Sequence, residues 1–377
     1  MKAGWQRKQL GKLAELRGRI GWRGLTAKEY TQEGPLFLSV HSLNYGDYVD
    51  FRDAFHISEE RYIESPEIIL QENDVLICKD GAGIGKLGIV GELPDRTTIN
   101  SSLLLIRSGK DILPKFLYRC LSSPYFQEIV NSRLNGATTP HLYQRDITEF
   151  PVVLPPLPEQ QRIIGILDEA FDDIATAKAN AEKNLQNARA LFESHLHGVN
   201  AEKALLGDLV KITTGKLDAN AAVEGGEFPF FTCSREIFAI DKYAFDCEAI
   251  LLAGNNAVGD FNVKHYKGKF NAYQRTYVIT VNEQKRVLYR FLYFQMLKSL
   301  KKFKAQSVGA GTKFLKLGMI KEMEIELPSL AEQERIVSTM DSVREETQRL
   351  ESLYQRKLAA LDELKKSLLH QAFAGEL

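Results

Sequence analysis

The Gly-rich segment at residues 81–86, GAGIGK, comes nearest in this chain to a nucleotide-binding motif. A phosphate-binding loop needs four residues between its first glycine and the Gly-Lys pair, and then Ser or Thr to hold magnesium. This segment is one residue short, and Leu87 stands where the hydroxyl residue is required. We therefore expect a tight glycine turn after an apolar strand at Val75–Cys78.

The other reactive side chains do not have the spacing that metal binding, hydrolysis or methyl transfer requires. The histidines considered as ligands are His41, His56, His141 and His265. Pro94-Asp95 is not followed by Glu-x-Lys within thirty residues, and the Glu363-Leu364-Lys365 triplet falls on a long helix where its charged ends face different directions. The sequence also has no nucleophile elbow and no Asn-Pro-Pro-Tyr-like amino-methylation motif. We expect a binding protein without a catalytic site, metal or cofactor of its own.

Charge is balanced overall, with 49 basic and 49 acidic residues, but it is segregated along the chain. Between Phe261 and Lys321 there are fourteen basic residues and one acid, Glu283, whereas residues 29–95 hold fourteen acids and four basic residues. Aromatic residues alternate with the cations of the basic segment: Phe261, Tyr266, Phe270, Tyr273 and Tyr277. Such a segment favours a surface that binds a polyanion, although a solvated face is the alternative.

An internal repeat indicates which elements position these side chains. Residues 154–168, LPPLPEQQRIIGILD, and residues 327–341, LPSLAEQERIVSTMD, share eight identities at an offset of 173. The turns Gly136-Ala137-Thr138-Thr139 and Gly309-Ala310-Gly311-Thr312 stand ahead of them. An internal sequence repeat indicates a repeated structural unit with a repeated binding role. The repeat therefore predicts two similar domains, each followed by a long helix.

Apolar residues after each repeat recur at alternating four- and three-residue spacing, which is typical of a coiled-coil seam. The seam of the second helix is Ile336, Met340, Val343, Thr347, Leu350, Tyr354, Lys357, Leu361, Leu364 and Leu368. The same positions of the first helix are rich in alanine, so the two helices should pack closely. Each would have roughly 40 residues and a length of about 60 Å.

Local signals mark the ends of both helices. Ser329 and Glu332 form an S-x-x-E capping box, and Pro158 with Glu159 replaces it in the first copy. Gly198 and Gly375 are the expected stops.

Composition sets the remaining limits. The chain has 377 residues, 44% hydrophobic, which suits two domains of a soluble globular protein. It has no run of about 18 apolar residues, no signal peptide and four cysteines without C-x-x-C spacing, so we expect a cytoplasmic protein with reduced thiols. The expected fold class is α+β: mixed domains at residues 1–155 and 200–328, and long helices at 156–199 and 329–377.

The paired Pro-rich approach and Glu-Gln-x-Arg-Ile segments resemble the DNA-specificity subunit of a type I restriction-modification system, over essentially the whole chain. The resemblance implies two target-recognition domains at opposite ends of an antiparallel helix pair, and each would read half of a split DNA site. It also implies two methyltransferase subunits and a restriction subunit with a motor as partners. S-adenosylmethionine, ATP and Mg would belong to those partners, and no membrane is involved.

Residue type and position select the candidate DNA contacts, since Lys and Arg hold phosphates while Arg, Asn and hydroxyl groups read base edges. In the first half they are Lys79, Lys86, Arg96, Arg133, Thr138, His141, Tyr143 and Arg145. In the second half they are Arg235, Asn255, Asn256, Lys264, Lys267, Arg275, Lys301, Lys302, Lys304 and Lys313. For each one a solvated surface residue is the alternative.

Two other functions stay open. The chain could be a coiled-coil adaptor whose basic face meets an acidic protein, which predicts no sequence-dependent DNA footprint. A free-standing nuclease or methylase is disfavoured by the missing motifs, and an activity assay on the purified chain would test it.

Overall fold

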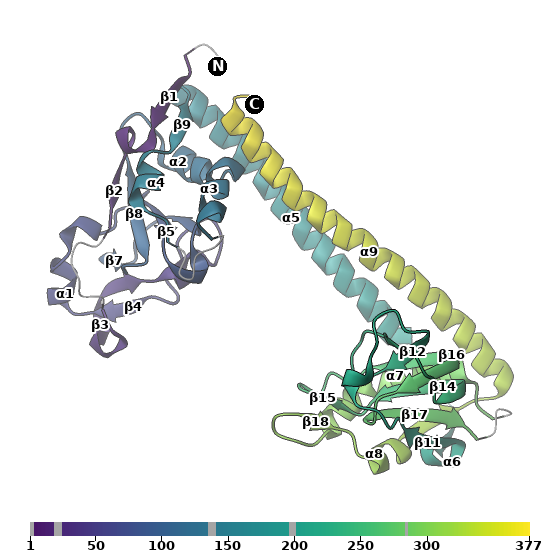
Figure 1. Ribbon diagram of the computed structural model, residues 1–377. Helices are drawn as coiled ribbons and strands as arrows, with labels where there is room; N and C mark the ends of the chain where they lie inside the picture. Colours follow the sequence, from purple (N-terminus) through teal and green to yellow (C-terminus); the bar gives the residue numbers. More distant parts are fainter. Residues whose placement is uncertain (1–3, 19–24, 135–140, 196–200, 283–285) are drawn as a thin grey trace. The chain divides into compact units, whose positions relative to one another are not determined.

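The computed structural model describes residues 4–18, 25–134, 141–195, 201–282 and 286–377, and the chain divides into two compact units (Figure 1). The first unit holds Met1–Asn180 and Lys357–Leu377, and the second holds Ala181–Arg356. Both divisions fall inside long helices, α5 (Leu157–His195, 39 residues) and α9 (Leu330–Ala374, 45 residues). Each unit therefore contains a part of both helices. The length of each helix confirms the expectation from the heptad pattern.

The first unit is built on small sheets, antiparallel except for the parallel pair β3–β7, packed against short helices. Its strands are β1 (Gln6–Gln9), β2 (Ala14–Arg17), β3 (Tyr30–Leu38), β4 (Phe55–Ile57), β5 (Val75–Cys78), β6 (Leu87–Ile89), β7 (Thr97–Ile99), β8 (Leu103–Ser108) and β9 (Pro151–Leu154). Its short α-helices are α1 (Glu59–Ile63), α2 (Pro114–Leu121), α3 (Pro124–Leu134) and α4 (Gln144–Thr148). The sheets have the orders β2-β8-β5-β6, β4-β3-β7 and β1-β9. Strand β5 is apolar throughout and fully buried, as an internal strand covered on both faces should be.

The second unit is built on one six-stranded sheet with the order β11-β17-β14-β16-β12-β13. Its strands are β10 (Glu202–Leu205), β11 (Val210–Thr214), β12 (Phe228–Phe231), β13 (Phe238–Ile240), β14 (Phe245–Ala253), β15 (Asn255–Asn256), β16 (Val263–Ala272), β17 (Thr276–Val281), β18 (Lys313–Phe314) and β19 (Glu324–Leu327). Its short helices are α6 (Leu206–Leu209), α7 (Tyr289–Gln306) and α8 (Leu317–Lys321). Helix α7 packs on β14 and β16, and its aromatic residues fill the core there. The apolar strand that the sequence predicts at Val75–Cys78 is β5 of the first unit.

The repeated glutamine of each half joins the start of a long helix to its domain. Gln333 is fully buried, accepts the N–H of Leu288 (2.9 Å), and donates to the carbonyl oxygens of Arg286 (2.8 Å) and Pro328 (2.9 Å). Gln160 makes the same three bonds in the first unit, to the backbone of Leu113, Asp111 and Pro155. In each copy the glutamine side chain provides hydrogen-bond partners for three backbone groups. The repeated glutamine is therefore a structural joint that fixes the start of the long helix to its domain.

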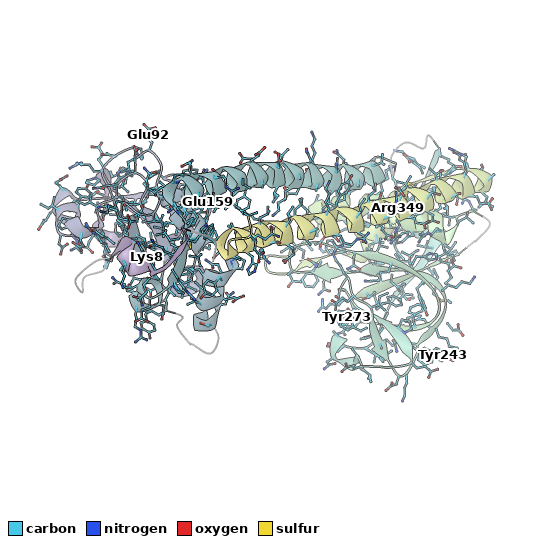
Figure 2. The ribbon with its side chains drawn as sticks, turned by 90° about the horizontal axis from the view of Figure 1, so that it is seen from above. Lys8, Glu92, Glu159, Tyr243, Tyr273 and Arg349 are labelled. Atoms are coloured by element: carbon cyan, nitrogen blue, oxygen red, sulfur yellow. The ribbon has the colours of Figure 1, made fainter. Side chains whose placement is uncertain are left out.

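The neighbouring repeat residues face outward. Glu159, labelled in Figure 2, stands on the first turn of α5 and accepts from Arg162 at 2.7 Å. Glu332 and Arg335 form the same pair at 2.6 Å. Only half of the predicted capping box is present, because the Ser329 hydroxyl accepts the Glu332 N–H (3.4 Å) while the Glu332 carboxylate turns to Arg335.

Parts of the two long helices pack on each other inside each unit. In the first unit Lys178 forms an ion pair with Asp362, and Arg162 donates to the backbone oxygen of Leu377 (3.1 Å), so the segments run antiparallel (Figure 1). In the second unit the buried Ala188 meets Thr347, whose hydroxyl donates to its carbonyl oxygen (3.4 Å). The alanine positions of the first helix thus allow the close approach that the sequence predicts.

The seam drifts near the end of α9. The sequence predicts Leu364 in the seam, but that side chain is 46% exposed. Lys365 instead covers the ring of Phe171 at 4.7 Å, and Leu369 and Ala372 are buried. A straight α-helix drifts by about 20° per heptad against a strict seven-residue repeat, so the buried stripe moves along by one position.

The stop at Gly375 is confirmed. Gly375 has φ +82°, a left-handed conformation that favours glycine, and the Glu376 N–H donates to the Gln371 oxygen (2.8 Å), as in a Schellman motif. The other expected stop, Gly198, and the turn at residues 136–139 lie outside the described residues.

Candidate nucleic-acid interface

A short two-stranded ribbon extends from the six-stranded sheet of the second unit. Strand β14 ends at Ala253, and Gly254 then donates its N–H to the Arg275 oxygen (2.9 Å) and accepts the Leu315 N–H (2.9 Å). The next two residues form β15, which pairs with β18 (Figure 1). We call residues 254–264 together with residues 308–315 the second-unit lobe. Since its ribbon has few partners in the sheet, the lobe projects loop residues away from the core.

A cavity of about 480 Å³ opens beside this lobe. Its lining comes from the loop after β12, from the lobe, from α7 and from α9. The charged residues of that lining are five cations and one carboxylate: Arg235, Lys264, Lys301, Lys304, Arg344 and Asp260. Fixed positive charges gathered around one cavity attract phosphate groups. The fold therefore concentrates side chains from residues 235 to 344 into one cationic surface, which we call the cationic cavity.

Two of these residues also hold the wall of the cationic cavity. Lys264 donates to the Ser234 oxygen and to the Asn262 side-chain oxygen, both at 2.6 Å. Burial, with a further contribution from the Arg235 guanidinium, lowers the pKa of Lys264. Arg235 itself lies in solvent and pairs with Asp260 at 2.7 Å. Lys264 therefore fixes the start of β16, while Arg235 stands at the mouth of the cavity.

The turn at Gly259 brings further predicted contacts together. A side chain at Gly259 would meet Lys304 Cγ at 3.3 Å and Lys313 Cγ at 3.5 Å, so these two lysines flank the turn. Asn256 accepts the N–H groups of Val258 (2.9 Å) and Asp260 (3.0 Å) through its side-chain oxygen. The Asn256 side chain therefore stabilises the turn. The side chain of the neighbouring Asn255 does not make these turn bonds.

Arg275 closes the other side of the lobe. Its guanidinium lies over the ring of Phe314 at 5.2 Å, and its backbone oxygen accepts the Gly254 N–H. Two predicted contacts lie elsewhere. Lys267 pairs with Glu248 across β14 and β16 (3.6 Å), and Lys302 lines a separate small hollow beside Phe303, facing away from the side where Lys301 and Lys304 line the cationic cavity. Lys301, Lys302 and Lys304 of α7 thus do not act as one cluster.

The aromatic residues of the basic segment are mostly core residues, which corrects their interpretation as part of a polyanion-binding surface. Phe261 and Phe270 are buried, and Tyr277 donates its hydroxyl to the Leu315 oxygen (2.8 Å). Alternation along β16 places Tyr266 and Phe270 on one face and the exposed Lys267 and Lys269 on the other. Tyr243, labelled with Tyr273 in Figure 2, is an exposed ring, and Lys269 lies 4.8 Å from its centroid.

The first unit has an equivalent but smaller lobe. Lys79, directly after β5, makes the same two backbone bonds as Gly254, to Ser102 (2.8 Å) and from Leu142 (2.8 Å). Asp80 then pairs with His141 as a bridge, and their side chains are hydrogen-bonded. The segment at residues 81–85 is the turn between β5 and β6, as its glycines predict, and not a phosphate loop.

Most predicted contacts of the first unit surround this smaller lobe. Lys79 lies 3.5 Å from Asp80, Tyr143 packs edge-on against His141, and Lys86 donates to Asn44 (2.5 Å). Arg145 is exposed on α4.

One predicted contact, Arg96, does not join that group, and two others lie outside what the structure describes. Arg96 lies in another sheet region, where it pairs with Glu59 (2.7 Å) over the ring of Tyr62. Thr138 lies outside the described residues, as does the side chain of Arg133 on α3.

The first unit also has a cavity against its part of α9, of about 280 Å³, but its lining holds three cations against two carboxylates. Lys365 and Lys366 face Asp47 and Asp362 there, and Arg119 pairs with Asp47 at 2.6 Å. Burial raises the pKa of Asp47, but Arg119, the Tyr118 hydroxyl and Lys365 more than offset it, so the pKa lies below its usual value. The strong positive excess is thus a property of the second unit.

Sequence reasoning missed Arg344 as part of the site. It stands on α9 beside the predicted seam residue Val343, donates to the Tyr293 hydroxyl at 2.7 Å, and lines the cationic cavity. The sequence signal that could have identified it is a positively charged residue next to the seam of a helix that was expected only to pack on the other long helix. Within the described ranges, no three His, Cys, Asp or Glu side chains gather in a way that could hold a metal ion. Of the helices in the part of the chain that the structure describes, none has the length and apolar character of a membrane span.

Comparison with known sequences points to one family. The family model described as "Type I restriction modification DNA specificity domain" matches residues 2–185 and 199–357. The EcoDI specificity subunit of a type I restriction enzyme from Escherichia coli is 39% identical over 172 residues, which are 46% of this chain and 37% of that protein. The MjaVIII specificity subunit from Methanocaldococcus jannaschii is 30% identical over 112 residues, 30% of this chain and 25% of that protein. The matches thus span about a third or less of the curated relatives.

Solved structures agree on the fold. A chain from work on complex assembly and conformational transition of the type I R-M system superposes with a TM-score of 0.80 at 17% identity, covering 100% of this chain and 99% of that one. The HsdS subunit from Thermoanaerobacter tengcongensis gives a TM-score of 0.59 at 16% identity, with 100% and 98% coverage. At these identities the likeness concerns the fold alone.

Proposed function

Because the chain belongs to the family of type I restriction modification DNA specificity domains, we propose that it is a sequence-specific DNA-binding subunit. It reads a bipartite target with a fixed spacer and directs partner methyltransferase and restriction subunits to that target. The observation that carries this proposal is the cationic cavity, because five cations against one carboxylate suit a DNA backbone better than any small substrate. The equivalent lobe in the other unit supports a second reading surface.

Each part of the proposed site has its own task. Lys301, Lys304 and Arg344 hold phosphates and so set the position of the DNA, while the lobes present side chains to base edges. We assign recognition of the two DNA half-sites to residues 1–155 and 200–328. The helices at 156–199 and 329–377 set the distance between these half-sites. The partly exposed pairs Glu159–Arg162 and Glu332–Arg335 are offered as contacts for the methyltransferase subunits.

In this proposal the chain contributes recognition and no chemistry. The bond-making groups, with S-adenosylmethionine for methylation and ATP and Mg for restriction, belong to the partners. A chromosomal target places the complex in the cytoplasm of a prokaryotic cell. The adaptor alternative differs in that its basic face would bind an acidic protein and would not discriminate between DNA sequences.

The test is methylation mapping in cells that carry this chain together with its methyltransferase subunits, against cells in which only this chain is deleted. We expect one bipartite motif with a fixed gap, methylated only when the chain is present. A motif that stays methylated without the chain, or a continuous motif, would contradict the proposal. A purified complex that binds the target and a scrambled duplex equally well would favour the adaptor.

A further inference from the structure

Val258, at the tip of the second-unit lobe, is an apolar side chain held out in solvent. It is 69% exposed, more than any other large hydrophobic residue that the structure describes. Exposed valines in ordinary surface loops need no explanation. Val258 differs because it directly precedes Gly259 and Asp260, which line the cationic cavity, and a side chain with no polar group contributes nothing to phosphate binding there.

The turn that carries Val258 is firmly built. The Asn256 side-chain oxygen accepts the N–H of Val258 at 2.9 Å and that of Asp260 at 3.0 Å. Gly259 follows with φ +73°, a conformation that other residues rarely adopt. Because these bonds fix the loop before any ligand arrives, a contact made by Val258 costs little ordering entropy.

Long cationic side chains stand around the same tip. Lys304 and Lys313 both lie close to Gly259, and Arg235 forms an ion pair with the neighbouring Asp260. A protein partner would need a wider apolar patch than one valine among cations. A nucleic acid fits better, because its phosphates can meet the cations while an apolar group on a base meets the valine.

In the major groove that apolar group is the C5-methyl of thymine. We infer that Val258 is a specificity-determining residue that contacts one thymine methyl group in the half-site read by the second unit; this rests on the proposed function. The equivalent turn of the first unit differs, because Ile84 there is buried. The two half-sites are therefore read by different chemistry.

The methyl group itself can be removed from the DNA, which gives a direct test. The full chain, assembled with its methyltransferase subunits, is titrated with target duplexes in which each thymine is replaced singly by uracil. We expect about a fourfold loss of affinity at one position, the value of burying one methyl group. In the Val258→Ala complex this loss at that position should shrink to less than twofold, because the partner of the methyl group is gone.

The matched control is Val223→Ala, which makes the same change at another exposed valine of the second unit, away from the cationic cavity. It should keep the uracil penalty of the unchanged chain. Equal affinity for thymine and uracil at every position overturns the inference, as does a penalty that survives in Val258→Ala at each position. If the unchanged complex does not prefer its target to scrambled DNA, the proposed function itself fails.

Discussion

The separation of the lysines on α7 gives a test of the cationic cavity. Lys301 and Lys304 line it, whereas Lys302 and Lys267 lie outside it. We expect Lys301→Ala with Lys304→Ala to remove two phosphate contacts. The control, Lys267→Ala with Lys302→Ala, removes the same charge from residues outside the cavity, so non-specific loss of positive charge affects both variants alike.

The size of the effect follows from counterion release. Each phosphate contact contributes about 0.9 to the slope of log affinity against log salt concentration, so the cavity pair should flatten the slope by about 1.8. When salt rises from 50 to 200 mM, each phosphate contact contributes a decrease in affinity of about 3.5-fold. Two contacts contribute about twelvefold, so the fold-decrease in affinity over this range should be about twelve times smaller for the cavity variant than for the unchanged complex. The control pair should change the slope by less than half as much.

The assay is equilibrium titration of the assembled complex against a fluorescent target duplex at four salt concentrations. Thermal unfolding of both variants checks that the second unit is intact. If the slope of the cavity variant equals that of the unchanged complex, or if the control pair flattens it equally, the cationic cavity is not the phosphate-binding surface.

Three further predictions concern the helices and the first unit. Gln333→Ala should reduce the free energy of unfolding by about 2–4 kcal/mol, since it leaves three buried backbone groups unsatisfied; a urea titration showing a loss below about 0.5 kcal/mol would count against the structural joint. Removing seven residues from each of α5 and α9 should shorten the preferred spacer by about three base pairs, at 1.5 Å per residue and 3.4 Å per base pair, and an unchanged gap in methylation mapping would refute the role of the helices in spacing. The pKa of Asp47 is lower in the folded state, so its contribution to stability is complete above the unfolded value of about 4 and is lost as pH falls through the folded pKa. Asp47→Asn should therefore reduce the loss of stability that the unchanged chain shows below pH ~4. Identical profiles of unfolding free energy against pH would show that the pair with Arg119 contributes nothing.

The internal repeat made much of this fold predictable from sequence. Identity at an offset of 173 residues located both long helices, and the glutamine of each copy makes the same three backbone bonds. Short-range rules also worked at Gly375 and at the glycine turn after β5, because a helix stop or a tight turn depends on only a few neighbouring residues.

Features that depend on long-range packing were not predictable in the same way. The drift that exposes Leu364 accumulates over the whole helix, and no local pattern reveals it. The aromatic residues of the basic segment were expected in a polyanion-binding surface, but Phe270 is a core residue because alternation along β16 places it on the face opposite Lys267 and Lys269. Arg344 reaches the cationic cavity from a helix nearly 40 residues beyond Lys304, and only the tertiary fold shows that they share one surface.

The central claim is that each domain independently reads one half of a split target. It is tested most directly by replacing residues 200–328 of the full chain with the corresponding part of another family member and mapping methylation with unchanged partner subunits. The account predicts a motif in which one half is new while the other half and the gap are retained. A motif in which both halves change, or neither does, would contradict it.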